Sequence, residues 1–299
     1  MATHPQAAIL LPPPAAARYL EFGLRKDATR TKAAAALASL AAAAPVDGVS
    51  VLTGFGLSLA DLLGLRIPGL REFPTLASTH VEIPSTPRAL WIWIRGEDRG
   101  EILLRSRAIE RALSSAFDPA SSVDAFRYDI GRDLTGYEDG TENPKAEAAT
   151  EAAIVGGRVD GAAPAGSSFV AVQLWQHDLV RFAAMDKALQ DCVIGRERIS
   201  NDEIADAPQY AHVKRTAQES FDPPSFVVRR SMPWSDETRE GLMFVAFGAT
   251  LDAFERQLRR MAGLDDGIVD GVFLYSKPLA GSYYWCPPVV DGRVALSGL

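Results

Sequence analysis

Hydrophobic and polar residues in the first half of the chain fall into blocks that favour strands and helices in turn. Apolar and β-branched clusters predict strands at residues 7–11, 18–24, 49–55, 90–94 and 123–130. Helices are expected at 27–44, where alanine dominates, and at 58–63 and 101–115. The segment 90–94 is apolar at every position, which is typical of a strand that is covered on both faces.

The second half repeats this order after a change in composition. Residues 146–168 are rich in alanine and glycine and have little periodicity, so we interpret them as a linker. Beyond it, strands are expected at 168–175, 226–230, 242–247 and 273–275, and helices at 179–193 and 250–262. The last helix carries its apolar residues on one stripe, as a helix packed on a sheet does.

Each half thus runs strand, helix, strand and then strand, helix, strand. This is the βαββαβ order of a ferredoxin-like unit. We therefore predict an α+β protein of two ferredoxin-like domains, residues 1–150 and 151–299. Their antiparallel sheets are expected to pack face to face, with the helices outside.

Composition and charge narrow the function classes. The chain has 299 residues, 47% of them hydrophobic, and a net charge of -7, which is ordinary for a globular protein. Lysine and arginine form no basic block, so nucleic-acid binding is not expected. No apolar stretch approaches the ~20 residues that cross a bilayer. The N-terminal segment lacks the basic start of a signal peptide, and we expect a cytoplasmic protein without a membrane partner.

Cysteines and histidines offer few metal sites of the common kinds. Cys192 and Cys286 are too few for a disulfide framework or a thiolate cluster. The four histidines are His4, His80, His177 and His212, and no two have the spacing of a zinc helix. A single histidine of this kind is more often a surface or core residue than a ligand. Walker loops and Gly-x-Ser-x-Gly elbows are absent from the sequence.

Three acids and two glycines crowd the loop 136–144, which ends in Asn143-Pro144. An ordinary turn explains such a loop, because Asp-Gly and Asn-Pro pairs are turn formers. The loop also offers what the edge of a cofactor needs, since glycine lets backbone come close and Asp139 presents a carboxylate.

Two adjacent arginines, Arg229 and Arg230, lie in the strand expected at 226–230. Successive side chains of a strand point to opposite faces, so one of the two is expected to face inward. An inward arginine costs energy unless it meets an anion or an acceptor. A pair on the surface remains the alternative if this strand lies at the edge of its sheet.

These segments together resemble a known family. Gly136, Asp139 and Gly140, followed by Thr141 and Asn143-Pro144, resemble the Gly-x-x-Asp-Gly signature of the dye-decolourising peroxidases. His212 and Arg229 follow in the order in which that family places its proximal haem histidine and its distal arginine. The likeness extends over 168–173, 193–196, 241–244 and 270–288, and is greatest to the compact bacterial cytoplasmic branch.

The resemblance implies haem b, iron protoporphyrin IX, bound in the C-terminal half. His212 would be the iron ligand, and Asp270 would accept a hydrogen bond from its other ring nitrogen. On the open face Asp139 would move the proton of the peroxide, and Arg229 would stabilise the developing negative charge. Ser231 would position water or peroxide, although some relatives carry asparagine there.

The haem propionates also need cations or donors. Arg196, Arg215 and the loop that begins at Thr141 are the candidates that the resemblance offers. For either arginine, a solvated surface charge is an equally good interpretation.

The function implied is a haem-dependent peroxidase that reduces hydrogen peroxide and oxidises dyes, phenolics or other one-electron donors. The alternative is a non-catalytic haem or porphyrin binder, or an iron-handling protein, with the same fold and the same His212. A third interpretation is a structural ferredoxin-like assembly protein without a cofactor. Compact relatives self-associate, so a homo-oligomer is expected. The segment 291–299 is too short to decide whether the chain is the cargo of an encapsulin nanocompartment.

Overall fold

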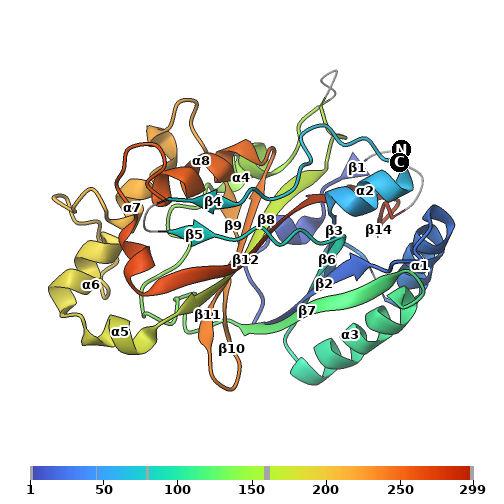
Figure 1. The fold of residues 1–299 in the computed structure, drawn as a ribbon, viewed down its shortest axis with the longest axis horizontal. Helices are drawn as coiled ribbons and strands as arrows, with labels where there is room; N and C mark the ends of the chain where they lie inside the picture. The colour runs from blue at the N-terminus through green and yellow to red at the C-terminus, as the bar shows by residue number, and fades with distance from the viewer. Residues whose placement is uncertain (1–2, 45, 79–80, 158–161, 297–299) are drawn as a thin grey trace.

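The N-terminal half of the chain builds one four-stranded antiparallel sheet. The computed structural model describes residues 3–44, 46–78, 81–157 and 162–296. Strands β2 (Ala16–Leu24), β3 (Val51–Phe55), β6 (Leu90–Gly96) and β7 (Phe117–Phe126) lie in the order β7-β2-β6-β3. Helices α1 (Arg30–Ala43) and α3 (Arg99–Leu113) pack together on its outer face (Figure 1).

The C-terminal half repeats this topology. Strands β8 (Ser168–His177), β10 (Met232–Ser235), β11 (Glu240–Gly248) and β12 (Ser276–Cys286) lie in the order β12-β8-β11-β10, and β9 (Val228–Arg229) also pairs with β11. The connections contain helices α5 (Leu179–Ala184), α6 (Lys187–Ile194), α7 (His212–Arg215) and α8 (Asp252–Met261). The order of strands confirms the predicted ferredoxin-like class, whereas the domain boundary at residue 150 stays a prediction.

The two sheets face each other and are joined at both edges. Phe55 of β3 pairs with Trp285 of β12, and Ala125 of β7 pairs with Trp234 of β10. One buried cluster fills the space between the sheets and draws on both halves of the chain. At its centre the Trp91 ring stacks on Tyr284, with centroids 6.0 Å apart. The fully apolar segment predicted to be covered on both faces is this central strand β6.

The remaining elements are short and lie at the periphery. They are strands β1 (Thr3–His4), β4 (Leu76–Ala77), β5 (Glu82–Ile83), β13 (Val289–Val290) and β14 (Arg293–Val294), helices α2 (Leu57–Leu63) and α4 (Ala146–Ala153), and the 3-10 turns η1 (Ala7–Ile9), η2 (Gln218–Ser220) and η3 (Gly271–Leu274). Among the described helices, none is both long and apolar enough to cross a bilayer.

Four predicted elements differ from the structure. The strand expected at 7–11 contains the turn η1 instead. The amide of Ala8 donates to the carbonyl of Gly48, and the side chains of Ala8 and Ile9 are buried. The linker expected at 146–168 begins with helix α4, whose alanine content already favours a helix. The helix expected at 179–193 is divided, because Asp186 caps the start of α6 by accepting from the Leu189 amide at 2.8 Å.

The last strand was also misplaced. Residues 273–275 belong to the turn η3 and its end, and the strand that follows is the eleven-residue β12. Pro278 and Gly281 obscure its pattern in the sequence, and the register with β8 shifts between Pro278 and Ala280. This strand positions a side chain discussed below, because its first residue, Ser276, lines a cavity in the C-terminal half.

Candidate active site

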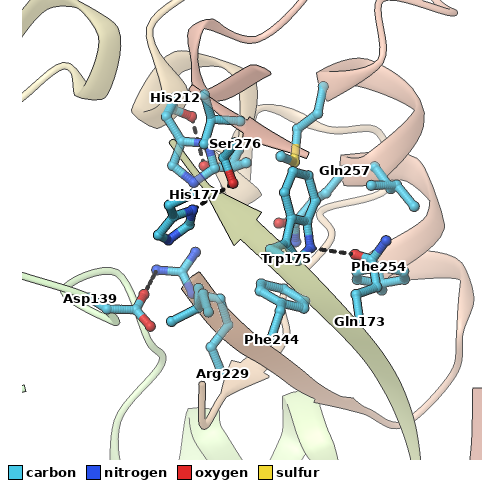
Figure 2. A pocket seen from close by; sticks show the side chains of 15 residues that line it. Asp139, Gln173, Trp175, His177, His212, Arg229, Phe244, Phe254, Gln257 and Ser276 are labelled. Carbon is cyan, nitrogen blue, oxygen red and sulfur yellow. Dashed lines mark hydrogen bonds and ion pairs between the residues drawn. The ribbon is translucent and has the colours of Figure 1, made fainter. Parts of the chain in front are cut away.

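An open cavity, referred to below as the main cavity because it holds the candidate site, lies in the C-terminal half between strands β8 and β11 and helices α7 and α8 (Figure 2). Its apolar lining comprises Trp175, Leu242, Phe244, Phe254, Leu258, Met261 and Val272. Its polar lining comprises Asp139, Gln173, His177, His212, Thr216, Arg229, Gln257 and Ser276. A mostly apolar cavity with a few convergent polar groups is the usual form of a ligand site.

His212 enters this cavity from the first position of the four-residue helix α7. Its Nδ1 lies 2.8 Å from Oδ2 of Asp270, whose side chain has no exposed surface. The other oxygen of Asp270 accepts from the Val272 amide at 2.9 Å, so the carboxylate is held in place. Because an ionised carboxylate only accepts, Nδ1 donates and Nε2 keeps its lone pair free for a metal ion. The His212 side chain is 30% exposed, which leaves it accessible.

A glycine allows the chain to bring His212 to this place. Helix α6 ends at Gly195, which has a left-handed φ of 91°. A Cβ atom there would lie 2.3 Å from Cγ2 of Val213, the residue after His212. Only glycine satisfies both the backbone conformation and this close approach.

Asp139 and Arg229 lie together on another wall of the same cavity (Figure 2). An Nη of Arg229 is 3.6 Å from Oδ1 of Asp139, and their side chains are 15% and 25% exposed. This distance is an ion pair but too long for a hydrogen bond, so both groups keep donors and acceptors for a third partner. The Nε of Arg229 is buried and has no partner among the described residues.

Asn143 joins the Asp139 loop to the arginine strand. Its Oδ1 accepts from the Arg229 amide at 2.7 Å, and its Nδ2 donates to the Arg229 carbonyl at 3.1 Å. Gly140, with a φ of 77°, makes room for this clamp, because a Cβ there would lie 2.7 Å from Nδ2 of Asn143. The loop is therefore more than an ordinary turn, since it fixes Asp139 relative to Arg229.

The prediction that one of the two adjacent arginines faces inward is confirmed, and the alternative of a surface pair is wrong. Arg230, which is 9% exposed, is also buried. Its two Nη atoms donate to the carbonyls of Arg229 and Leu10. No pattern in the sequence predicts that the carbonyl of Leu10 in the N-terminal segment would meet this arginine.

His177, at the end of β8, is a site residue that the sequence did not single out. Its Nδ1 lies 2.7 Å from Oγ of Ser276 and its Nε2 lies 3.0 Å from Oδ1 of Asp133. Thr135 donates to the other oxygen of Asp133 through its amide and its hydroxyl. Asp133 and Ser276 are 44 and 99 residues away from His177, so no local pattern predicts the group.

The network around His177 makes stability depend on pH. Burial raises the pKa of Asp133, but the hydrogen bonds of His177 and Thr135 outweigh it, and the pKa lies below 3.8. The contribution of the ionised carboxylate is therefore complete above the unfolded pKa of about 3.9 and lost as the pH falls through the folded value.

We expect Asp133→Asn to lower the free energy of unfolding at pH 7 by about 1–3 kcal/mol, because it weakens the acceptor of a buried pair. The difference from the parent protein should shrink as the pH falls from about 4 toward the lower folded pKa, because the unfolded state takes up the proton first and the folded state only at lower pH. Urea denaturation between pH 3 and pH 7 measures it. An unchanged difference across this range would show that the carboxylate charge has no such role.

The other predicted site residues lie outside the main cavity. Ser231 lines a second cavity, and its hydroxyl accepts from the Val245 amide at 3.3 Å. Thr141 accepts from Nδ2 of Asn201 at 3.0 Å. His4 is exposed in β1, and His80 lies outside the described residues.

The two arginines proposed for propionates already have carboxylate partners. Arg196 contacts Glu142 and Glu203, and its side chain is 11% exposed. Arg215 is buried and forms two hydrogen bonds of 2.7 Å with Asp266. Neither lines the main cavity, so a contact with a ligand there would require these ion pairs to rearrange.

Comparisons with known proteins agree with this geometry. The sequence model described as "Dyp-type peroxidase, C-terminal" matches residues 131–291, which include every residue that lines the main cavity. A dye-decolorizing peroxidase of Brevibacterium linens is 28% identical over 293 residues, covering 93% of this chain and 79% of the relative.

Solved structures match over nearly the whole chain. A DypB variant of Rhodococcus jostii RHA1 in complex with heme superposes with a TM-score of 0.85 at 28% identity, covering 95% of this chain and 96% of that one. The encapsulated DyP-type peroxidase of Mycobacterium smegmatis gives a TM-score of 0.87 at 25% identity, covering 96% of both chains. These matches support the ferredoxin-like fold independently of the strand order.

Proposed function

This chain belongs to the Dyp-type peroxidase family, and from that premise we propose that it binds haem b through His212 and acts on hydrogen peroxide with Asp139 and Arg229. Membership makes the protein a peroxidase, and therefore an oxidoreductase. The observation that carries the proposal is that His212, with Asp270 behind it, opens on the same cavity as Asp139 and Arg229.

The residues of the cavity fit a haem. The described residues contain no group of three or more His, Cys, Asp and Glu side chains that could hold a metal ion. A bare iron would thus lack ligands, whereas a porphyrin supplies four nitrogens and needs one axial histidine. The apolar side chains of Phe244, Leu258 and Met261 suit the faces of such a ring. The heme bound by the similar DypB variant supports the same choice.

Haem, when bound, supplies the redox-active iron at which peroxide is reduced and from which the oxidising equivalents pass to a donor. Asp139, as a carboxylate, accepts a proton from one peroxide oxygen and returns it to the other. Arg229, which cannot lose its charge, stabilises the negative charge that develops as the O–O bond breaks. Asp270 orients the His212 imidazole and makes its Nε2 more electron-rich. Ser231 is proposed to position water or peroxide from the adjoining cavity.

We expect Asp270→Asn to lower the affinity for haem by about 10–100-fold, as the loss of a partner behind a metal-binding histidine generally does. The reason is that the amide no longer enforces the tautomer that presents the Nε2 lone pair. Titration of the cofactor-free protein with haem, followed at the Soret band, measures the change. Asp206→Asn, at an exposed position, serves as the control and should bind haem like the parent protein. Equal affinities of the two variants would remove Asp270 from this role.

Peroxide-dependent oxidation of a phenol or dye by the haem-loaded protein tests the proposed function. A peroxidase consumes peroxide and oxidises the donor in proportion. A mere haem binder would show a Soret band but no oxidation of the donor above that of free haem. That second result would overturn the catalytic roles of Asp139 and Arg229 and leave only the binding role of His212.

We propose a cytoplasmic homo-oligomer that oxidises dyes, phenolics or other small donors. The encapsulated relative of Mycobacterium smegmatis supports the further proposal that this chain is the cargo of an encapsulin nanocompartment. Co-expression with an encapsulin shell, followed by density-gradient separation, tests the packaging, because free protein would remain at the top of the gradient.

A further inference from the structure

A second cavity lies beside the main one and shares Asp139, Arg229 and Leu242 with it. It is open to solvent and has room for a small molecule of about 190 Å³. Its lining carries an excess of positive charge. Four arginines line it, at positions 127, 132, 229 and 230, against the single carboxylate of Asp139.

Arg230 is the buried cation of this second cavity. It is 9% exposed, and among the described residues no carboxylate lies within ion-pair distance of it. Its Nη atoms donate to the backbone carbonyls of Arg229 and Leu10, and its buried Nε has no partner among the described residues. A guanidinium has five N–H donors, so this one keeps donors for a ligand. Burying such a charge without an anion is costly.

A second buried arginine, Arg95, adds to the unbalanced positive charge around Arg230. Arg95, also 9% exposed, donates to the carbonyls of Val49 and Pro12, and it too lacks a carboxylate partner among the described residues. Burial and, to a smaller extent, the nearby charge of Arg95 together lower the pKa of Arg230 to about 10. Pro12 is a neighbour of both groups, because its carbonyl accepts a hydrogen bond from Arg95 and it lines the cavity that contains Arg230.

The rest of the lining distinguishes an organic anion from a bare ion. Arg132 is neutralised by Asp129 and Glu138, whereas Arg127 is exposed and forms no ion pair among the described residues. Apolar surface adjoins these arginines, from Tyr128 and Ile130, which are 45% and 71% exposed, and from Met232 and Pro233. A halide ion would gain no binding free energy from contact with this apolar surface. The carboxylate of Asp139 disfavours an anion that carries more than one negative charge.

We propose that the second cavity binds a small aromatic carboxylate. Its carboxylate group meets Arg230 and Arg127, and its ring lies against the apolar wall of Tyr128, Ile130 and Met232. Guanidinium groups are the preferred partners of carboxylates because their paired N–H donors match the two oxygens. This binding site goes beyond the peroxidase function and does not depend on it.

Calorimetric titration of the purified protein with benzoate, without peroxide, tests the proposal. Benzoate is expected to bind, acetate to bind more weakly because it lacks the ring, and the isosteric neutral benzamide to give no measurable heat. Arg230→Gln should weaken benzoate binding by about tenfold or more, since it removes a charge-assisted hydrogen bond at a buried position. Arg127→Ala should weaken it by about twofold to fivefold, as expected of an exposed charge.

Arg111→Ala provides the matched control, because it removes one exposed positive charge from α3 and Arg111 lines neither cavity. It should bind benzoate like the parent protein. If Arg230→Gln fails to fold, Arg127→Ala and the charge reversal Arg127→Glu still decide the matter, because Arg127 lines the second cavity and not the main one.

Three results would overturn the proposal. The first is no binding of benzoate, and the second is equal binding of benzoate and benzamide, which would mean an apolar cavity without an anion site. The third is equal binding of chloride and benzoate, which would mean a bare anion site. A peroxidase that failed to turn over would leave all three measurements unaffected.

Discussion

Arg229→Leu is expected to lower the peroxide-dependent activity of the haem-loaded protein by about 10²–10³-fold, the usual effect of removing one preorganised donor from a site of developing charge. Leucine fills part of the volume of the side chain but carries neither charge nor donor. The backbone of residue 229 should stay in place, because the Asn143 clamp holds its amide and carbonyl. Haem binding should therefore persist while the reaction with peroxide slows. Steady-state rates at several peroxide concentrations, with the Soret band as the measure of loading, give both quantities.

Two further variants sharpen this result. Arg111→Leu, at the exposed end of α3, should keep the parent rate. Arg229→Lys keeps a positive charge without the planar fork and should fall between the parent and the leucine variant. A rate for Arg229→Leu within twofold of the parent would exclude the assigned role of the guanidinium.

His212→Ala is expected to weaken haem binding by more than about 100-fold, because losing the ligand should cost more than the ~10–100-fold that losing its partner costs. The cavity would remain apolar, so we expect haem to bind weakly even without the axial imidazole. Titration with haem, followed at the Soret band, measures both the affinity and the ligand state.

Added imidazole distinguishes the loss of the iron ligand from a loss of the folded structure. His212→Gly leaves space for free imidazole, which should restore the parent spectrum in proportion to its concentration. His4→Ala, at an exposed histidine of β1, should bind haem normally. A parent-like spectrum of His212→Ala without imidazole would mean that another residue binds the iron.

The fold class could be predicted because it depends on the order of elements. Strands such as β6 and helices such as α3 are long and strongly patterned, and two βαββαβ orders leave few ways to pack. The errors lie where a local pattern was weak or was overridden by contacts far along the chain. Pro278 and Gly281 interrupt β12, and the apolar residues of η1 are buried in a turn.

The sequence predicted three residues of the candidate site but not the network around them. Asp139, His212 and Arg229 come from a family signature, and the structure brings them to one cavity, whereas their roles stay proposals. His177 carries no signature, because its partners are distant in sequence and meet only in the folded chain. The carboxylate partners of Arg196 and Arg215 could not be predicted either, because a sequence does not show which side chains an arginine contacts.

A crystal structure of the haem-loaded protein would decide whether His212 binds the iron. We expect iron bonded to Nε2 of His212, the porphyrin in the main cavity, and Asp139 and Arg229 on the opposite face of the ring. Iron bonded to any other side chain, or a porphyrin bound elsewhere with Asp139 and Arg229 away from it, would show that the proposed haem site is wrong.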